Sequence, residues 1–140
     1  MHICDNGFMV EEPFTPGEET FVAHDSPVHP HSVFFEDDGQ TGYFYALDLS
    51  CEEDMILDAV HIYNVADAVD RDRPSQAKVI WSDDGLKSVL LINGYPHAAF
   101  DFQARRGYCR NNFPNFPAKD SNRWHREDHE WSESAISWLS

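Results

Sequence analysis

The chain has 140 residues, 41% of them hydrophobic and 14% aromatic, which is enough for one domain with a packed core that needs no disulfide or metal. Its formal net charge is −15, and the charge is unevenly distributed. The first 70 residues carry 16 acidic and no basic side chains, a charge of −16, while residues 71–140 carry 9 acidic and 10 basic ones, a charge of +1. Such a field repels nucleic acid and anionic membranes and attracts basic partners, although an acidic surface also serves plain solubility.

Other broad classes are disfavoured by the local composition. The first residues lack the basic start and apolar run of a signal peptide, and no later segment has the length of a membrane span, so we expect a soluble, cytoplasmic protein. Three cysteines, Cys4, Cys51 and Cys109, stand without CxxC spacing. They are expected to be reduced thiols, with no disulfide framework and no thiolate zinc site.

The first half of the chain contains a strand and a hairpin. Residues 1–17 mix acids, prolines and isolated apolar residues, so they are expected to be irregular. Residues 18–24 alternate as a strand, and the prolines of residues 25–31 favour a loop. Residues 32–49 read as two aromatic strands joined at Asp38-Gly39, with acids at a solvated tip. In this hairpin, Phe34, Tyr43, Tyr45 and Leu47 are expected to turn one or both faces to the core.

The middle of the chain contains an ambiguous segment and a clear meander. Residues 51–65 fit either a helix or a strand, and we expect a short helical turn followed by a strand. Residues 78–102 hold three apolar runs separated by Asp84-Gly85 and Asn93-Gly94, the pairs that favour tight hairpin turns. The run Val89 to Ile92 is apolar on both faces, so a second layer or a helix must cover each face.

The last third is expected to hold an ordered loop and a helix. Residues 103–120 contain a glycine, three arginines and two Phe-Pro pairs, which predict an ordered loop. Trp124, Trp131 and Trp138 recur at seven-residue steps, which predicts one helical face within residues 121–139. The fold class expected is therefore α+β: a single domain with an antiparallel sheet of about six strands and a C-terminal tryptophan-rich helix packed on it.

Three segments resemble one known family. The words EDDGQTGYFYALD at 36–48, LLINGYPHAAFDF at 90–102 and RGYCRNNFP at 106–114 are similar to a bacterial family of small acidic proteins known as domain of unknown function 2251. The resemblance covers most of the chain from Phe34 onward. It implies a compact α+β bacterial domain with no settled activity, so it brings no catalytic residues.

The second half of the chain contains residue types that could bind a metal, act as a nucleophile or line a ligand pocket. His125 and His129 are four apart but fit neither metalloprotease order, so neither a metal nor any other cofactor is expected. Cys109, His97 and Asp101 have the residue types of a nucleophilic trio, yet Cys109 lacks an activating signature. A small-molecule pocket beside the sheet is an open alternative, and its lining residues would be His97, Asp101, Arg105, Arg106, Tyr108 and Arg110.

The acidic half offers a different hypothesis, and the sequence favours it. Acids around the first hairpin, with tyrosines as aromatic anchors, predict a surface for a basic protein partner. Such a non-enzymatic protein would fit the role of an immunity protein whose carboxylates replace phosphates in the cleft of a nuclease-like toxin. A structural subunit that associates with itself is a third possibility. The partner-binding residues expected are Glu36, Asp37, Asp38, Tyr43, Tyr45, Asp48, Glu52, Glu53, Asp54 and Asp58.

Overall fold

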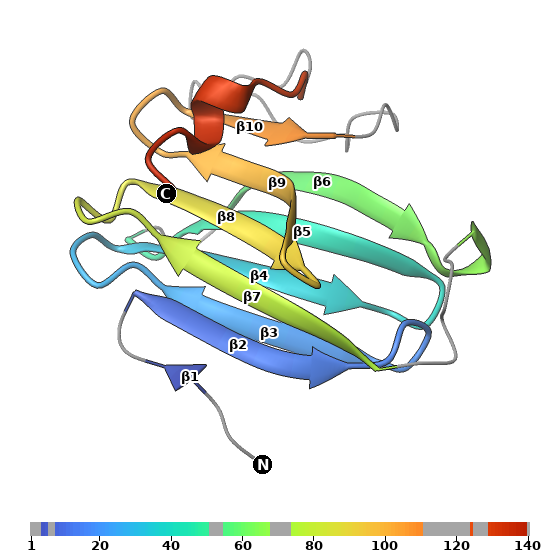
Figure 1. The fold of residues 1–140 in the computed structure, drawn as a ribbon. Helices are drawn as coiled ribbons and strands as arrows, with labels where there is room; N and C mark the ends of the chain where they lie inside the picture. Colours follow the sequence, from blue (N-terminus) through green and yellow to red (C-terminus); the bar gives the residue numbers. More distant parts are fainter. Residues whose placement is uncertain are drawn as a thin grey trace.

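Two antiparallel sheets packed face to face make up the protein (Figure 1). The computed structural model describes residues 4–5, 8–50, 55–67, 74–110, 124 and 129–139. Within these residues one sheet has six strands in the order β1-β2-β7-β8-β9-β10, and the other has four in the order β3-β4-β5-β6. The six-stranded sheet consists of β1 (Cys4–Asp5), β2 (Met9–Phe14), β7 (Ser75–Trp81), β8 (Lys87–Ile92), β9 (Tyr95–Asp101) and β10 (Arg106–Cys109). The four-stranded sheet consists of β3 (Thr20–Asp25), β4 (His31–Asp37), β5 (Thr41–Asp48) and β6 (Ile56–Asn64).

The expected α+β class is wrong, because the described residues form a β-sandwich without a long helix. The helical elements among them are single 3₁₀ turns, η1 (Val65–Asp67) and η2 (Glu133–Ile136). The seven-residue spacing of the tryptophans does not mark one face, because Trp124 packs between the sheets and Trp138 packs outside them. Part of the predicted helix, residues 121–123 and 125–128, lies outside the described residues. No helix in the described part of the chain is long and apolar enough to span a membrane.

Two further corrections concern strands that the local sequence does not reveal. The segment expected to be irregular contains β2, which pairs with β7 and buries Val10 and Phe14. The acids Glu11 and Glu12 and then Pro13 interrupt the alternation of apolar and polar residues that would have predicted this strand. Likewise β10, within the expected loop 103–120, pairs with β9; residues 111–120 lie outside the described part. Both strands owe their pairing to neighbours in the sheet rather than to a local turn signal.

Most of the other expected strands are confirmed. The hairpin β4-β5 turns at Gly39, whose φ of 99° suits glycine, and β8 and β9 are joined by Asn93 and Gly94 at φ 53° and 82°. Asp84-Gly85 instead lies in a longer loop between Trp81 and Lys87. The ambiguous segment forms the strand β6 from Ile56 onward. Residues 51–54, at the start of the expected helical turn, lie outside the described residues.

Apolar side chains from both sheets fill the space between them. Phe35, Phe44, Leu90 and Phe100 are fully buried there. On the outer face of the six-stranded sheet, a second cluster forms around Val89, Leu91 and Ala99, against which Ile80, Ile136, Trp138 and Leu139 pack. Both faces of β8 are therefore covered, as its uninterrupted apolar run predicts.

Candidate binding face of the four-stranded sheet

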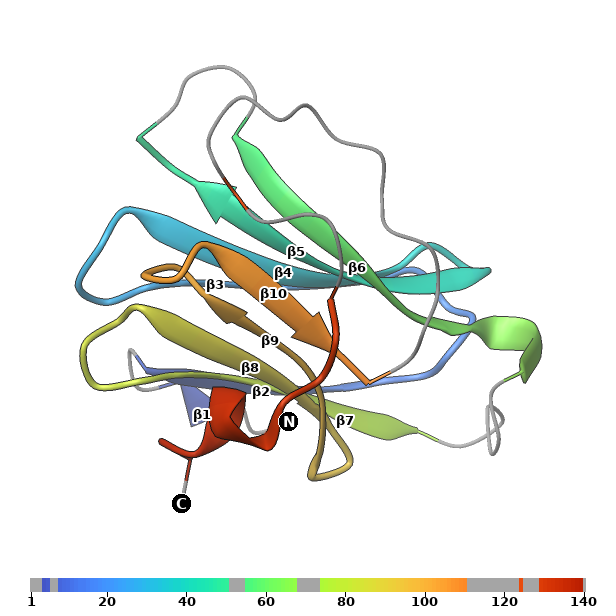
Figure 2. The same cartoon turned by 90° about the horizontal axis from the view of Figure 1, so that it is seen from above.

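The outer face of the four-stranded sheet carries a set of aromatic side chains in register. Residues alternate between the faces of a strand, and the pairing places Phe21, Glu36, Tyr43 and His61 side by side across the four strands. The next outward row contains Ala23, Phe34, Tyr45 and Ala59. Whereas η2 lies on the outer face of the other sheet, no described element lies over this one (Figure 2).

Ring contacts connect these aromatic residues into one surface. The Phe34 ring stacks on Tyr45 with centroids 4.2 Å apart, and Phe21 lies against Phe34 at 4.6 Å. Tyr43 is 5.9 Å from Tyr45 and 5.2 Å from the His61 ring. Phe21 is 61% exposed at the outer limit of this group. We call Phe21, Phe34, Glu36, Tyr43, Tyr45 and His61 the aromatic face.

A single carboxylate is set among these rings. The Tyr45 hydroxyl donates a hydrogen bond of 3.1 Å to Glu36 Oε1. Burial, and then the Glu36 carboxylate, raises the pKa of Tyr45 well above its ordinary value, so this phenol stays neutral. Glu36 is half-buried and keeps oxygen lone pairs for a further donor. The arrangement can therefore stack an apolar or planar group and pair a cation beside it.

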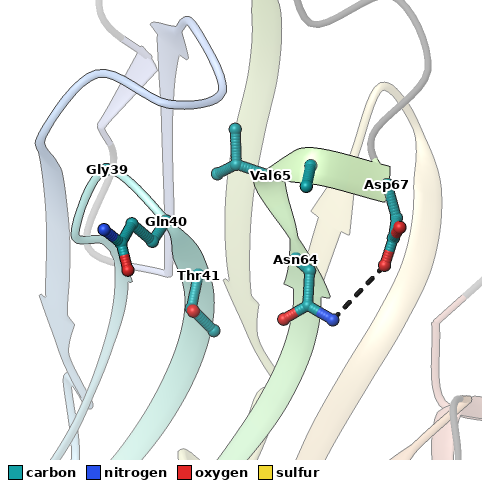
Figure 3. Close-up of a pocket in the computed structure, with 7 residues that line it drawn as sticks. Gly39, Gln40, Thr41, Asn64, Val65 and Asp67 are labelled. Atoms are coloured by element: carbon teal, nitrogen blue, oxygen red, sulfur yellow. Dashed lines mark hydrogen bonds between the residues drawn. The ribbon is translucent and has the colours of Figure 1, made fainter.

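Next to His61 of the aromatic face, a hollow with both polar and apolar lining has a volume of about 510 Å³ (Figure 3). It lies between the β4-β5 turn and η1, and its lining residues are Gly39, Gln40, Thr41, Asn64, Val65, Ala66 and Asp67. Asn64 connects the two regions, because its Oδ1 is 2.9 Å from His61 Nε2 and its Nδ2 donates to Asp67 Oδ2 at 3.4 Å. The exposed Asp67 carboxylate gives this hollow a negative charge.

Asp37, one of the expected partner-binding residues, is 1% exposed and lies inside the fold. Its Oδ2 accepts hydrogen bonds from the Tyr63 hydroxyl at 2.6 Å and from the Gly17 amide at 2.9 Å, and its Oδ1 accepts one from the Gly39 amide at 2.8 Å. Burial, and then this bond to Asp37, raises the pKa of Tyr63. Asp37 therefore holds the hairpin turn to its neighbours and is not part of a binding surface.

Asp58, expected on the same surface, is 2% exposed and lies between the sheets. Its Oδ2 is 2.7 Å from both Trp124 Nε1 and His129 Nε2, and its Oδ1 accepts the Ala59 amide at 2.8 Å. A buried carboxylate that is surrounded by hydrogen-bond donors in this way stabilises the fold. It fixes two points late in the chain to a position near the start of β6.

The remaining acids of that prediction have mixed positions. Asp38 is exposed at the hairpin turn, where the amides of Gln40 and Thr41 donate to Oδ1 and lower the pKa of the Asp38 carboxyl. Asp48 ends β5 and accepts the Ser50 amide and hydroxyl. Glu52, Glu53 and Asp54 lie outside the described residues. Of the expected set, Glu36, Tyr43 and Tyr45 are the members on the aromatic face.

The residues of the alternative pocket lie along β9, β10 and the turn that joins them, and His97, Asp101, Arg106 and Tyr108 share the outer face of the other sheet. Asp101 Oδ1 accepts the amides of Gln103 and Ala104 and closes the turn at residues 102–105, which includes Arg105. Arg106 stacks over the Tyr108 ring at 4.5 Å.

Arg110 Nε donates to the Pro96 carbonyl at 2.6 Å, and its guanidinium lies 4.6 Å from the Tyr95 ring and 4.0 Å from the Trp131 ring. Asp101, Arg106 and Arg110 are therefore already engaged in contacts within the fold.

The nucleophilic trio is not assembled. His97 and Asp101 share the outer face of β9, whereas Cys109 is buried on the opposite face with its thiol directed at the His61 carbonyl, 3.6 Å away. Burial, and then Arg110, lowers the pKa of His97. Among the residues whose positions are described, no three His, Cys, Asp or Glu side chains gather to bind a metal ion.

Sequence reasoning missed the orientation of the aromatic face. Phe34, Tyr43, Tyr45 and Leu47 were expected to contact the core, but the core positions of this hairpin are Val33, Phe35, Phe44 and Ala46. Both alternating sets are apolar, so the pattern does not say which one is inside. Phe21 and His61 join the face through pairing between strands, which no local pattern records.

Comparison with known proteins places the chain in a family. Residues 14–140 match the sequence pattern of a family described as "Uncharacterized protein conserved in bacteria (DUF2251)". The chain belongs to this family. An uncharacterized protein of Haemophilus influenzae is 41% identical to it over 104 residues, which cover 69% of this chain and 65% of the relative. The chain therefore spans just under two thirds of that relative's length. No solved structure matches this member of the family.

Proposed function

We propose that this protein is a non-enzymatic binding protein that docks a basic protein on the aromatic face. The observation that carries the proposal is the stack of Phe21, Phe34 and Tyr45 beside the half-buried carboxylate of Glu36. Aromatic anchors next to a partly desolvated charge are typical of the energetic centre of protein interfaces. The stack sits in the half of the chain that carries 16 acids and no base, so the partner that complements it is basic.

The shape of the surface indicates how a basic partner would be held. An arginine of the partner would stack its guanidinium on Tyr43 or Tyr45 and pair with Glu36, since planar guanidinium groups both stack and form forked hydrogen bonds. The hollow beyond His61 and Asn64 would take a second cationic side chain against Asp67. The narrower form of the proposal is an immunity protein, in which these carboxylates occupy the phosphate-binding cleft of a nuclease-like toxin domain.

The test is a binding comparison with charge-matched variants. The wild-type protein is used to isolate partners from its native host, and the affinity of any basic protein obtained is then measured for Glu36→Lys, Tyr45→Ala and the control Asp83→Lys. Asp83 is exposed in the loop between β7 and β8 of the other sheet, so the control makes the same change of charge away from the face. We expect each face variant to weaken binding by about tenfold or more, as loss of an interface anchor does, and the control to bind like wild type.

Two results would contradict the proposal. If no basic protein is retained, the proposed partner does not exist. If Glu36→Lys and Asp83→Lys bind the partner with equal affinity, the aromatic face is not the binding site. The immunity form has its own readout, because a stoichiometric amount of this protein should abolish nucleic-acid cleavage by the isolated partner. A partner without such activity would overturn that narrower form alone.

A further inference from the structure

β3 is the last strand on one side of the four-stranded sheet (Figure 1). Its pairing with β4 is antiparallel, and the Ser26 amide donates to the His31 carbonyl at 2.8 Å just beyond the strand. In an antiparallel pair, every second residue directs both backbone groups at the neighbouring strand. Thr20, Val22 and His24 therefore bond to β4, and Phe21, Ala23 and Asp25 direct their N–H and C=O groups away from the sheet.

The outward backbone groups of this edge are accessible. Phe21, Ala23 and Asp25 are all exposed residues, and within the described chain their outward N–H and C=O groups have no partner. An exposed run of unpaired strand groups is a template for another strand, which proteins commonly block with lysine, proline or a bulge. The sequence of β3, TFVAHD, contains neither lysine nor proline, and its register with β4 runs without a break.

The charge at this edge selects what can pair there. Glu18 and Glu19 precede β3 and Asp25 ends it, so both ends of the edge are acidic. An antiparallel second copy would place the acidic start of one strand beside the acidic end of the other, and each copy carries a net charge of −15. Like charges directly across a strand pair are destabilising, so self-pairing is opposed and a basic strand is favoured.

We propose that the free edge of β3 is a strand-addition site for an extended, basic segment of the protein partner. The added strand would continue the four-stranded sheet and bond to Phe21, Ala23 and Asp25. Its outward side chains would lie next to the exposed Phe21 ring, so the aromatic face would extend onto the partner. Main-chain hydrogen bonds would hold the segment, and the alternating side chains would select it. This inference rests on the proposed function for the identity of the partner.

The sharpest test removes one outward N–H group without touching the β3-β4 ladder. Ala23→Pro deletes an amide that has no partner in the sheet, a position at which an edge strand tolerates proline. Ala23→Val is the matched control, because it adds a side chain of similar size and keeps the amide. Thermal unfolding of both variants establishes that they are folded. The probe is a synthetic Lys-Val-Lys-Val-Lys-Val-Lys peptide, compared with its Glu-Val counterpart, and the readout is the NMR signals and hydrogen exchange of the backbone amides.

In the free protein, we expect the amides of Phe21, Ala23 and Asp25 to exchange quickly and those of Val22 and His24 to be protected. The basic peptide should protect the three outward amides, the acidic peptide should not, and Ala23→Pro should weaken peptide binding by about tenfold or more while Ala23→Val does not. The inference is overturned if the basic peptide leaves these amides unprotected or binds both variants equally. It is also overturned if the edge is protected in a concentration-dependent dimer of the free protein.

The same variants separate this inference from the proposed function. Binding of the native partner is measured for both variants. If Glu36→Lys loses this binding and Ala23→Pro keeps it, strand addition is overturned and the aromatic face remains the proposed binding site. If the basic peptide binds at β3 but the native partner binds Glu36→Lys as tightly as wild type, strand addition would stand and the aromatic face would be overturned as the binding site. Loss of partner binding in both variants, with Ala23→Val unaffected, is the outcome that we expect.

Discussion

Trp124 donates its indole N–H to the buried carboxylate of Asp58 over 2.7 Å, between residues 66 positions apart in the chain. His129 Nε2 reaches the same oxygen, also at 2.7 Å. Residues 124 and 129 are therefore both held near the start of β6 by one acidic side chain. An aspartate that the sequence suggests for a surface is in fact an internal anchor.

Replacement of Asp58 should strongly destabilise the fold. Asp58→Ala removes the carboxylate that accepts the Trp124 and Ala59 N–H groups inside the fold, and we expect the free energy of unfolding to fall by about 3 kcal/mol. Asp58→Asn keeps an acceptor oxygen and the shape, so its loss should be smaller. Urea unfolding followed by tryptophan fluorescence measures both. A loss below about 1 kcal/mol for Asp58→Ala would be that of an ordinary exposed acid and would contradict the anchor role.

Asp37 and Asp58 also show where prediction from the sequence ends. Turns are local, so the Asx-Gly pairs predicted the β4-β5 hairpin and the β8-β9 turn correctly. The burial of these two acids depends on the Tyr63 hydroxyl 26 residues from Asp37 and on the Trp124 indole 66 residues from Asp58. No local pattern contains such distances, and an acidic hairpin tip looks the same whether one of its acids is internal or not.

The same limit explains the aromatic face. Phe34 and Phe35 are adjacent, both aromatic and on opposite faces, so the sequence offers two equally apolar candidates for the core. The second sheet decides between them, because it covers Phe35 and not Phe34. The sequence suggested Tyr43, Tyr45 and Glu36 as candidate binding residues, but it did not show that they share one outer face of the sheet.

Gly42 should be intolerant of a side chain. An added Cβ would lie 2.5 Å from Tyr63 Cζ and 2.6 Å from Cε2, and the hydrogen bond to Asp37 prevents that ring from moving freely. We expect Gly42→Ala to lower the free energy of unfolding by about 2 kcal/mol through overpacking. Gly94→Ala is the comparison, because its Cβ meets open space and only its φ of 82° is strained, at a cost of about 1 kcal/mol. Denaturant midpoints should rank the two in this order, and the reverse order would show that the Tyr63 ring yields.

His31 should make the protein less stable in mild acid. Its ring stacks on Phe102 at 4.4 Å, and burial, supported by His29 and Arg105 and opposed by Asp48, lowers the pKa of His31 below 6.5. The unfolded chain therefore binds this proton first, so the contribution to stability is complete above pH 6.5 and is lost as the pH falls toward the folded-state pKa. His31→Gln should flatten the decline in unfolding free energy below pH 6.5, measured by urea titration at a series of pH values. An unchanged slope would mean that other groups set the acid response.

Arg110 should hold the last described residues against the six-stranded sheet, and lysine should not replace it. The guanidinium contacts both the Tyr95 and the Trp131 rings, its Nε donates to the Pro96 carbonyl, and its Nη2 is 3.2 Å from Glu133 Oε2. A lysine keeps the charge but loses the planar stack and the forked donors, so Arg110→Lys should lower the free energy of unfolding by about 1 kcal/mol. Glu133→Gln should lower the free energy of unfolding by less, because the exposed ion pair contributes little.

Hydrogen exchange of residues 131–139 should rise clearly in Arg110→Lys and slightly in Glu133→Gln. Equal exchange in the two variants would assign the attachment of this segment to Trp138 and its neighbours instead.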